Sequence, residues 1–166
     1  MIMIEPSGGV GDDGGVDEIV RGARRSIVTV VSPGRGGSGF VALSNGVVVT
    51  THDAVGFELD ADIVLEDGRS APARIVAVDV TANVALLLPD QPLGVPALRP
   101  APPTSRTLGA PVVAIARPRA GELTVASGLA SGDVRIGGAD WLRTSAPLGV
   151  GGARRSSTAA RASSGS

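Results

Sequence analysis

The chain of 166 residues has no cysteine, no lysine and no tyrosine, and its only histidine is His52. The absence of cysteine excludes disulfides, thiol catalysis and cysteine-based metal sites, and one histidine cannot build a histidine-rich zinc site. We therefore expect no metal and no cofactor. All 15 basic residues are arginine, and with the many Ala, Gly and Val residues this indicates a gene rich in G and C.

A strong charge of one sign and long apolar runs are also absent. The formal net charge is −1, and the largest basic clusters are the pairs Arg24-Arg25 and Arg154-Arg155, so the sequence predicts no nucleic-acid partner. No stretch approaches the roughly 20 apolar residues of a membrane span. The opening "MIMIEPSGGVGDDGGVDEIV" lacks the apolar run and the basic residues of a signal peptide. As it stands, the sequence predicts a cytoplasmic protein without a membrane segment.

The residues that are present favour β-structure. Hydrophobic residues make up 43% of the chain, mostly Val, Ala, Leu and Ile, and 24 Gly and 12 Pro interrupt them. Six short apolar segments follow one another: "SIVTVV", "SGFVAL", "GVVVTT", "DIVLED", "PARIVAVD" and "NVALLL". Turns such as "SPGRGG" and "EDGRS" separate them. Six short strands within about 65 residues predict a β-barrel.

A proline-rich stretch, "PDQPLGVPALRPAPPTSRTLG", divides the strand-forming parts and reads as an extended linker, because proline cannot occupy a central strand. Strand patterns then resume with "APVVAIARP", "ELTVASGLASG", "DVRIGG" and "WLRTSAP". The expected organisation is a flexible segment with a short helical turn (1–25), a first six-stranded barrel (26–90), a linker (91–108), a partial second barrel (109–150) and a low-complexity disordered tail (151–166).

The stretch "GRGGSGFVALSNGVVVTTHDAV" delivers His52 to the end of a strand and resembles the opening of the HtrA-type (DegP-like), trypsin-like serine proteases. In that family a Gly-Ser-Gly-Phe strand, a turn and a Thr-Asn-x-His-Val-Val segment carry the catalytic histidine. The resemblance continues through "IVLEDGRSAPARIVAVDVTANVALLL", "TVASGLASG" and "LRTSAPLG". It implies an all-β fold, the trypsin-like double β-barrel, with the first barrel complete and the second incomplete. It also implies an unfolded or extended peptide or protein as substrate.

The resemblance places His52 at the general-base position of the Ser-His-Asp triad, but the acid position holds Asn83. An amide carries no negative charge and can hold the imidazole in the wrong tautomer, which costs about 10⁴ in rate. Asp79 lies four residues earlier on the same strand, some 13 Å away at about 3.3 Å per residue. We expect Asp53 to point away from the imidazole. The loop residue Asp60 stays open as a substitute acid.

The nucleophile of the triad has no match. The positions at which the family's serine and its flanking residues fall are occupied by Gly149, Val150, Gly151 and Gly152. Ser156 and Ser157 follow closely, but they lack the preceding glycine turn that aims two N–H groups at an oxyanion. We expect neither serine to act as a nucleophile.

The tail suggests why the match ends. Residues 152–166 contain only Gly, Ala, Arg, Ser and Thr, as expected of a G- and C-rich strand read out of frame. With plausible codons, Gly151 to Ser166 read from the third base gives Gly-Gly-Pro-Ala-Leu-Val-Asp-Gly-Gly-Ala-Arg-Val-Val-Gly-Phe. This resembles the family's sequence after the nucleophile. Our hypothesis is a C-terminally truncated or frame-shifted relative.

Taken together, these patterns predict a protein of the serine endopeptidase family that is degenerate and inactive as it stands, because only His52 of the triad is matched. The alternative is a non-catalytic peptide-binding or scaffold β-barrel protein. A product without a function is a third interpretation. Members of the family are often exported or membrane-anchored, which the start of this chain does not indicate.

Overall fold

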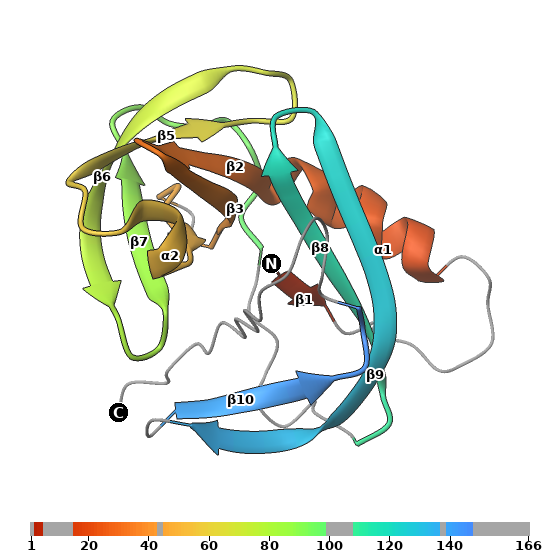
Figure 1. Cartoon of the computed structure of the whole chain (residues 1–166). Helices are drawn as coiled ribbons and strands as arrows, with labels where there is room; N and C mark the ends of the chain where they lie inside the picture. Colours follow the sequence, from red (N-terminus) through yellow and green to blue (C-terminus); the bar gives the residue numbers. More distant parts are fainter. Residues whose placement is uncertain (1, 5–14, 43–44, 99–107, 137–138, 148–166) are drawn as a thin grey trace.

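The computed structural model describes residues 2–4, 15–42, 45–98, 108–136 and 139–147. The chain forms ten strands, two α-helices and one 3-10 helix within these ranges (Figure 1). In order they are β1 (Ile2–Ile4), α1 (Gly15–Ala23), η1 (Arg24–Ser26), β2 (Ile27–Ser32), β3 (Arg35–Val41), β4 (Val48–Thr50), α2 (His52–Val55), β5 (Asp60–Val64), β6 (Ser70–Asp79), β7 (Val84–Pro89), β8 (Pro111–Arg119), β9 (Glu122–Ile136) and β10 (Ala139–Thr144).

Strands β2 to β7 form a closed barrel in the order β2-β3-β4-β7-β6-β5. Every neighbouring pair is antiparallel. Each of the six apolar segments expected between residues 26 and 90 supplies one of these strands. The predicted all-β class and the complete first barrel are therefore confirmed.

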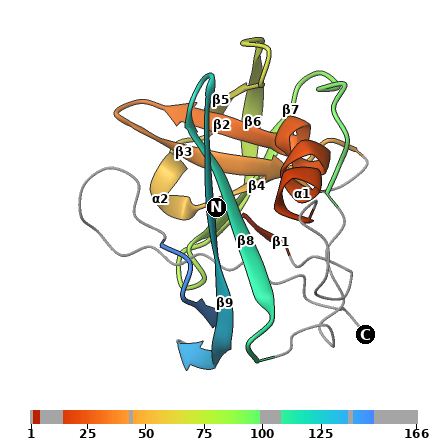
Figure 2. The ribbon, with the colours of Figure 1, turned by 90° about the vertical axis from the view of Figure 1, so that its right-hand side faces the viewer.

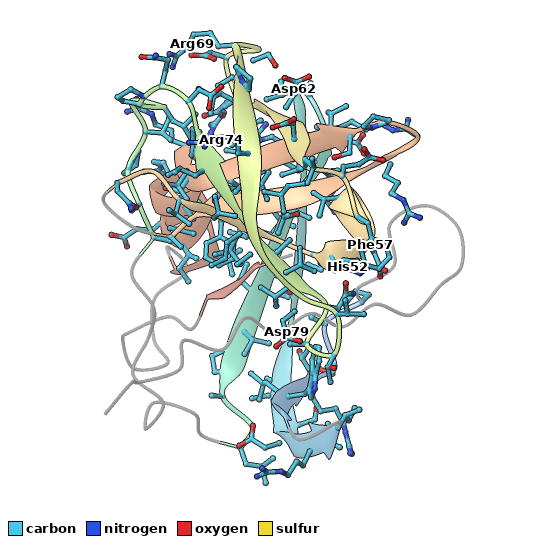
Figure 3. The ribbon with its side chains drawn as sticks, turned by 90° about the vertical axis from the view of Figure 1, so that its left-hand side faces the viewer. His52, Phe57, Asp62, Arg69, Arg74 and Asp79 are labelled. Carbon is cyan, nitrogen blue, oxygen red and sulfur yellow. The ribbon has the colours of Figure 1, made fainter. Side chains whose placement is uncertain are left out.

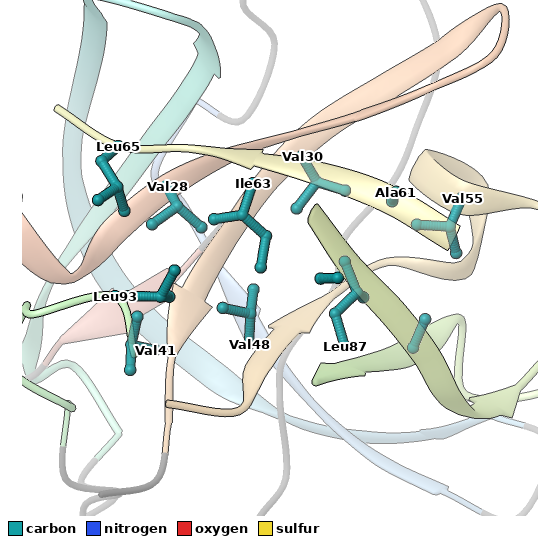
Figure 4. Packing of buried hydrophobic residues seen from close by; sticks show 12 residues of the cluster. Val28, Val30, Val41, Val48, Val55, Ala61, Ile63, Leu65, Leu87 and Leu93 are labelled. Carbon is teal, nitrogen blue, oxygen red and sulfur yellow. The ribbon is translucent and has the colours of Figure 1, made fainter. Parts of the chain in front are cut away.

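The barrel core is built by alternation along the strands. In β5, Ala61 and Ile63 are buried while Asp60 and Asp62 face solvent, because successive side chains of a strand point to opposite faces. Figure 4 shows these side chains meeting those of the other strands inside the barrel. Leu93 joins the same cluster from the segment after β7, so the described part of the expected linker also packs against the barrel.

The second sheet has the order β1-β8-β9-β10 and does not close into a barrel in the described part of the chain. This agrees with the predicted incomplete second barrel. We expected separate strands for "ELTVASGLASG" and "DVRIGG", but β9 is continuous over both. Its first half pairs with β8 and its second half with β10, so partners on two sides keep it extended through Gly132.

For residues 1–25 we expected a flexible segment with a short helical turn. The structure describes β1, which pairs with β8, and the nine-residue helix α1 there, and η1 begins at Arg24. Ile19, Val20 and Ala23 lie on one side of α1 and pack with Ile27 and Val113 in a second apolar cluster. Figure 2 shows α1 beside β8. No helix in the described ranges is long and apolar enough to cross a membrane.

A buried arginine lies where the barrel meets the second sheet. Arg117 on β8 is 1% exposed. Its Nε donates to the carbonyl oxygen of Ile27 at 3.0 Å, and one terminal nitrogen donates to that of Arg24 at 3.2 Å. The same nitrogen lies 3.7 Å from the carboxylate of Glu66. Burial lowers the pKa of the Arg117 guanidinium, and the nearby Glu66 carboxylate raises it in part.

Two side chains of the barrel form hydrogen bonds to the backbone of Arg117. The Thr29 hydroxyl donates to the carbonyl oxygen of Arg117 at 2.9 Å. The Ser38 hydroxyl oxygen accepts from the Arg117 N–H at 2.8 Å. These polar contacts fix the second sheet against β2 and β3, the two strands on the side of the barrel that faces β8 in Figure 1.

Candidate active site

Strand β4 delivers His52 to the rim of the barrel. Thr51 follows the strand in extended conformation, and helix α2 begins at His52. The Thr50 hydroxyl donates to the carbonyl oxygen of Ser38 at 3.0 Å and so fixes the end of β4 to β3. Gly56, with φ of 62°, ends α2 after a single turn, a conformation that glycine adopts at little cost. His52 is thus held on a short turn between two fixed ends.

Two glycines of β3 allow this turn and β4 to approach closely. A Cβ on Gly37 would lie 3.0 Å from the Cβ of Ala54 in α2. A Cβ on Gly39 would lie 2.9 Å from a methyl group of Val48. The "GRGGSGF" stretch therefore has a local function: its missing side chains make room for the segment that carries His52.

Strand register brings Asn83 to the same place. β4 pairs with β7 so that Thr50 lies opposite Ala85. His52 comes two residues after Thr50 and Asn83 two residues before Ala85, so both lie just beyond the same end of this strand pair. Asn83 has φ of 51°, a left-handed conformation that asparagine adopts more readily than most residues. The acid position of the family and the histidine therefore lie at one end of the barrel.

The Asn83 side chain, however, is engaged by Asp53. Its Oδ1 accepts from the backbone N–H of Asp53 at 3.0 Å. Its Nδ2 donates to the Asp53 carboxylate at 2.9 Å. These are the two hydrogen bonds that the Asn83 side chain makes to described residues. The amide therefore binds the first turn of α2, and both of these bonds go to the residue after the histidine.

The imidazole of His52 has an unused nitrogen. Its Nε2 is buried and has no hydrogen-bond partner among the described residues. The imidazole forms a T-shaped pair with the ring of Phe57, with the ring centroids 5.0 Å apart and the planes at 67°. Figure 3 shows the two side chains together at the α2 end of the barrel. In a serine protease this nitrogen faces the nucleophile's hydroxyl.

The remaining candidate acids, Asp79 and Asp60, make no hydrogen bond to the imidazole in the described part of the chain. Asp79 accepts the Ala82 N–H at 2.9 Å and so closes the turn before Asn83. Asp60 is exposed at the start of β5, opposite Arg74.

The positions expected for the nucleophile, Gly149 to Gly152, and the nearby Ser156 and Ser157 lie outside the described residues. No group of three or more His, Cys, Asp or Glu residues in the described ranges could hold a metal ion.

A six-stranded closed barrel, an open second sheet and a histidine at the barrel rim define a trypsin-like serine protease architecture. Comparison with known families agrees: the model of the trypsin-like peptidase domain matches residues 37–166. The chain belongs to the trypsin-like peptidase family, and within that family it is of the HtrA type.

Two zebrafish (Danio rerio) proteins support the narrower assignment. The chain is 34% identical to serine protease HTRA1B and 35% identical to serine protease HTRA1A, in each case over 109 residues. Each alignment covers 66% of this chain and 23% of the relative. The matched part of the chain thus spans less than a quarter of the length of these relatives.

Proposed function

We propose that this chain is a degenerate serine protease that keeps the general-base histidine but does not hydrolyse peptide bonds. The observation that carries the proposal is the position of the Asn83 amide. It occupies the family's acid position, and it is hydrogen-bonded to Asp53. No carboxylate in the described part of the chain is hydrogen-bonded to the imidazole of His52.

The chemistry of the family explains why this matters. A serine hydroxyl attacks the carbonyl carbon, the histidine takes its proton, and a carboxylate fixes the tautomer and stabilises the imidazolium that forms. Backbone N–H groups beside the serine stabilise the oxyanion. His52 can accept a proton through Nε2. An amide at position 83 cannot stabilise the resulting positive charge, and the sequence has no serine at the nucleophile positions.

The purified chain should hydrolyse neither fluorescent casein nor small ester substrates above background, because His52 has no activated serine to deprotonate. The matched control is His52→Ala, which should give the same background rate. A fluorophosphonate probe should leave the chain unlabelled, Ser156 and Ser157 included. Clear turnover in the parent that disappears in His52→Ala would contradict the proposal.

A second candidate function, non-catalytic binding of an extended peptide, is supported by the surface beside His52. Phe57 is 84% exposed and Leu59 is 78% exposed, although both are large apolar side chains. Exposed apolar groups next to one another are typical of interaction sites. This surface lies at the α2 end of the barrel, beside His52.

Binding should depend on this surface. Fluorescein-labelled unfolded casein should bind the parent, and the double substitution Phe57→Ser with Leu59→Ser should weaken binding by at least about tenfold, since burial of even one large apolar side chain contributes about 1.5–3 kcal/mol. The control is Val16→Ser on α1, which removes another exposed apolar side chain. Fluorescence anisotropy measures the affinity. Equal binding by all three proteins would exclude this surface as the binding site.

A further inference from the structure

The contact between Asp53 and Asn83 is reciprocal, and it joins two separate elements. Asp53 is the second residue of α2, and Asn83 directly precedes β7. The amide oxygen accepts the backbone N–H of Asp53, and the amide nitrogen donates to the carboxylate. Each group therefore meets a partner of complementary polarity. A carboxylate at position 83 would keep the first bond but lose the second.

A single Asn83→Asp substitution would thus bring two carboxylates together. In the present structure the Asp53 oxygen and the Asn83 nitrogen are 2.9 Å apart. Two ionised carboxylates at such a distance repel each other, and the pKa of one of them rises. By its spacing alone, position 83 is the acid position of the triad. The structure shows that its neighbour on α2 determines what an acid at that position would contact.

We infer that Asp53 is a positioning residue of the His52 site, whose carboxylate holds the Asn83 side chain on α2. An acid at position 83 can then serve the imidazole only when Asp53 is changed as well. The proposed function is used here only to assign His52 the role of general base. The readouts below are stability and the state of the imidazole, so they are independent of whether the chain hydrolyses or binds peptide.

Other charged groups surround the same turn and must be kept constant. The Arg35 guanidinium donates to the carbonyl oxygen of Asp53 at 3.3 Å and also lies close to Gly56. Asp79 is engaged by the Ala82 N–H. Neither group is changed in the variants proposed below. The variants therefore differ only in the pair formed by positions 53 and 83.

The experiment compares Asn83→Asp with the exchange variant Asp53→Asn/Asn83→Asp, which has the composition and net charge of the parent. Asn83→Asp should lower the folding equilibrium constant about tenfold at pH 7, which corresponds to a change of about 1 in a carboxyl pKa. A carboxyl whose pKa is raised by folding destabilises the fold when ionised, so the deficit should shrink as the pH falls towards 4. The exchange variant should regain the stability of the parent.

Because His52 is the only histidine, one labelled imidazole reports on the site without ambiguity. In ¹⁵N NMR, the exchange variant should show a protonated Nδ1 with a downfield, slowly exchanging proton, the signature of a hydrogen bond to a carboxylate. Asn83→Asp alone should not show this signal at pH 7, and neither should Asp53→Asn, the control for loss of the aspartate.

Three results would overturn the inference. The first is an Asn83→Asp variant as stable as the parent at pH 7, and the second is a downfield proton in that variant without the second substitution. The third is an exchange variant that folds yet leaves the imidazole signals of the parent unchanged. Should the exchange variant not fold, Asp53→Ala tests the same contact: it should shift the His52 ¹⁵N signals by releasing Asn83, and unchanged signals would refute the positioning role.

Discussion

Arg117→Ala should lower the free energy of unfolding by about 3–5 kcal/mol, because it leaves two backbone carbonyl groups without their donor and opens a cavity in the junction. The substitution leaves the carbonyl oxygens of Ile27 and Arg24 without their guanidinium donor. It also removes one of the two cations next to Glu66, since Arg24 pairs with the same carboxylate. Because Arg117 is only 1% exposed, removing its long side chain also leaves a cavity. Urea denaturation followed by Trp141 fluorescence measures the effect.

Arg119→Ala is the matched control, because it removes the same side chain from the same strand at an exposed position. Its effect should stay within about 0.5 kcal/mol. Arg117→Lys should fall between the two, since an ammonium group keeps the charge but cannot reach several acceptors in the fixed geometry of the guanidinium. A loss below about 1 kcal/mol for Arg117→Ala would show that the junction does not depend on this residue.

The burial of Arg117 could not be predicted from the sequence. In "VVAIARP" an arginine near the end of an apolar run is typical of a strand leaving the core. Its partners come from segments far away in the chain: Arg24 in η1, Ile27 at the start of β2 and Glu66 after β5. Only the packing of the two sheets brings them together. The strands of the first barrel, by contrast, could be predicted because alternation within each one, such as Ala61 and Ile63 in β5, is a local property.

The candidate site also has parts that could be predicted from the sequence and parts that could not. His52 could be found because it is the only histidine and stands in a recognisable stretch, and Asn83 followed from family spacing. The partnership of Asp53 with Asn83 was missed. We expected Asp53 to point away from the imidazole but did not identify its partner, which follows from the register that sets Thr50 opposite Ala85. The two strands that it pairs, β4 and β7, are separated by more than 30 residues of sequence. No local pattern therefore reveals the register.

Gly39→Val should lower the free energy of unfolding by about 3 kcal/mol, near the upper end of the cost of overpacking a core. A Cβ at this position would lie 2.9 Å from a methyl group of Val48, 3.1 Å from a methyl group of Val30 and 3.1 Å from the carbonyl oxygen of Val49. Val30 and Val48 are fully buried, so neither side chain has space to move. The third contact is backbone in β4, the strand that delivers His52. Urea denaturation measures the loss.

The Gly→Ala pair at positions 39 and 22 separates overpacking from the general effect of replacing glycine. Gly22 lies in α1 with nothing within 4 Å of its added Cβ. Gly22→Ala should therefore stabilise the protein by about 0.4–1 kcal/mol, because it reduces the freedom of the unfolded chain. Gly39→Ala should destabilise it and should also shift the ¹⁵N signals of His52, since β4 must move away from β3. If both alanine variants were more stable than the parent, the close approach of β3 and β4 would not require glycine, and the "GRGGSGF" stretch would have no role in placing the histidine.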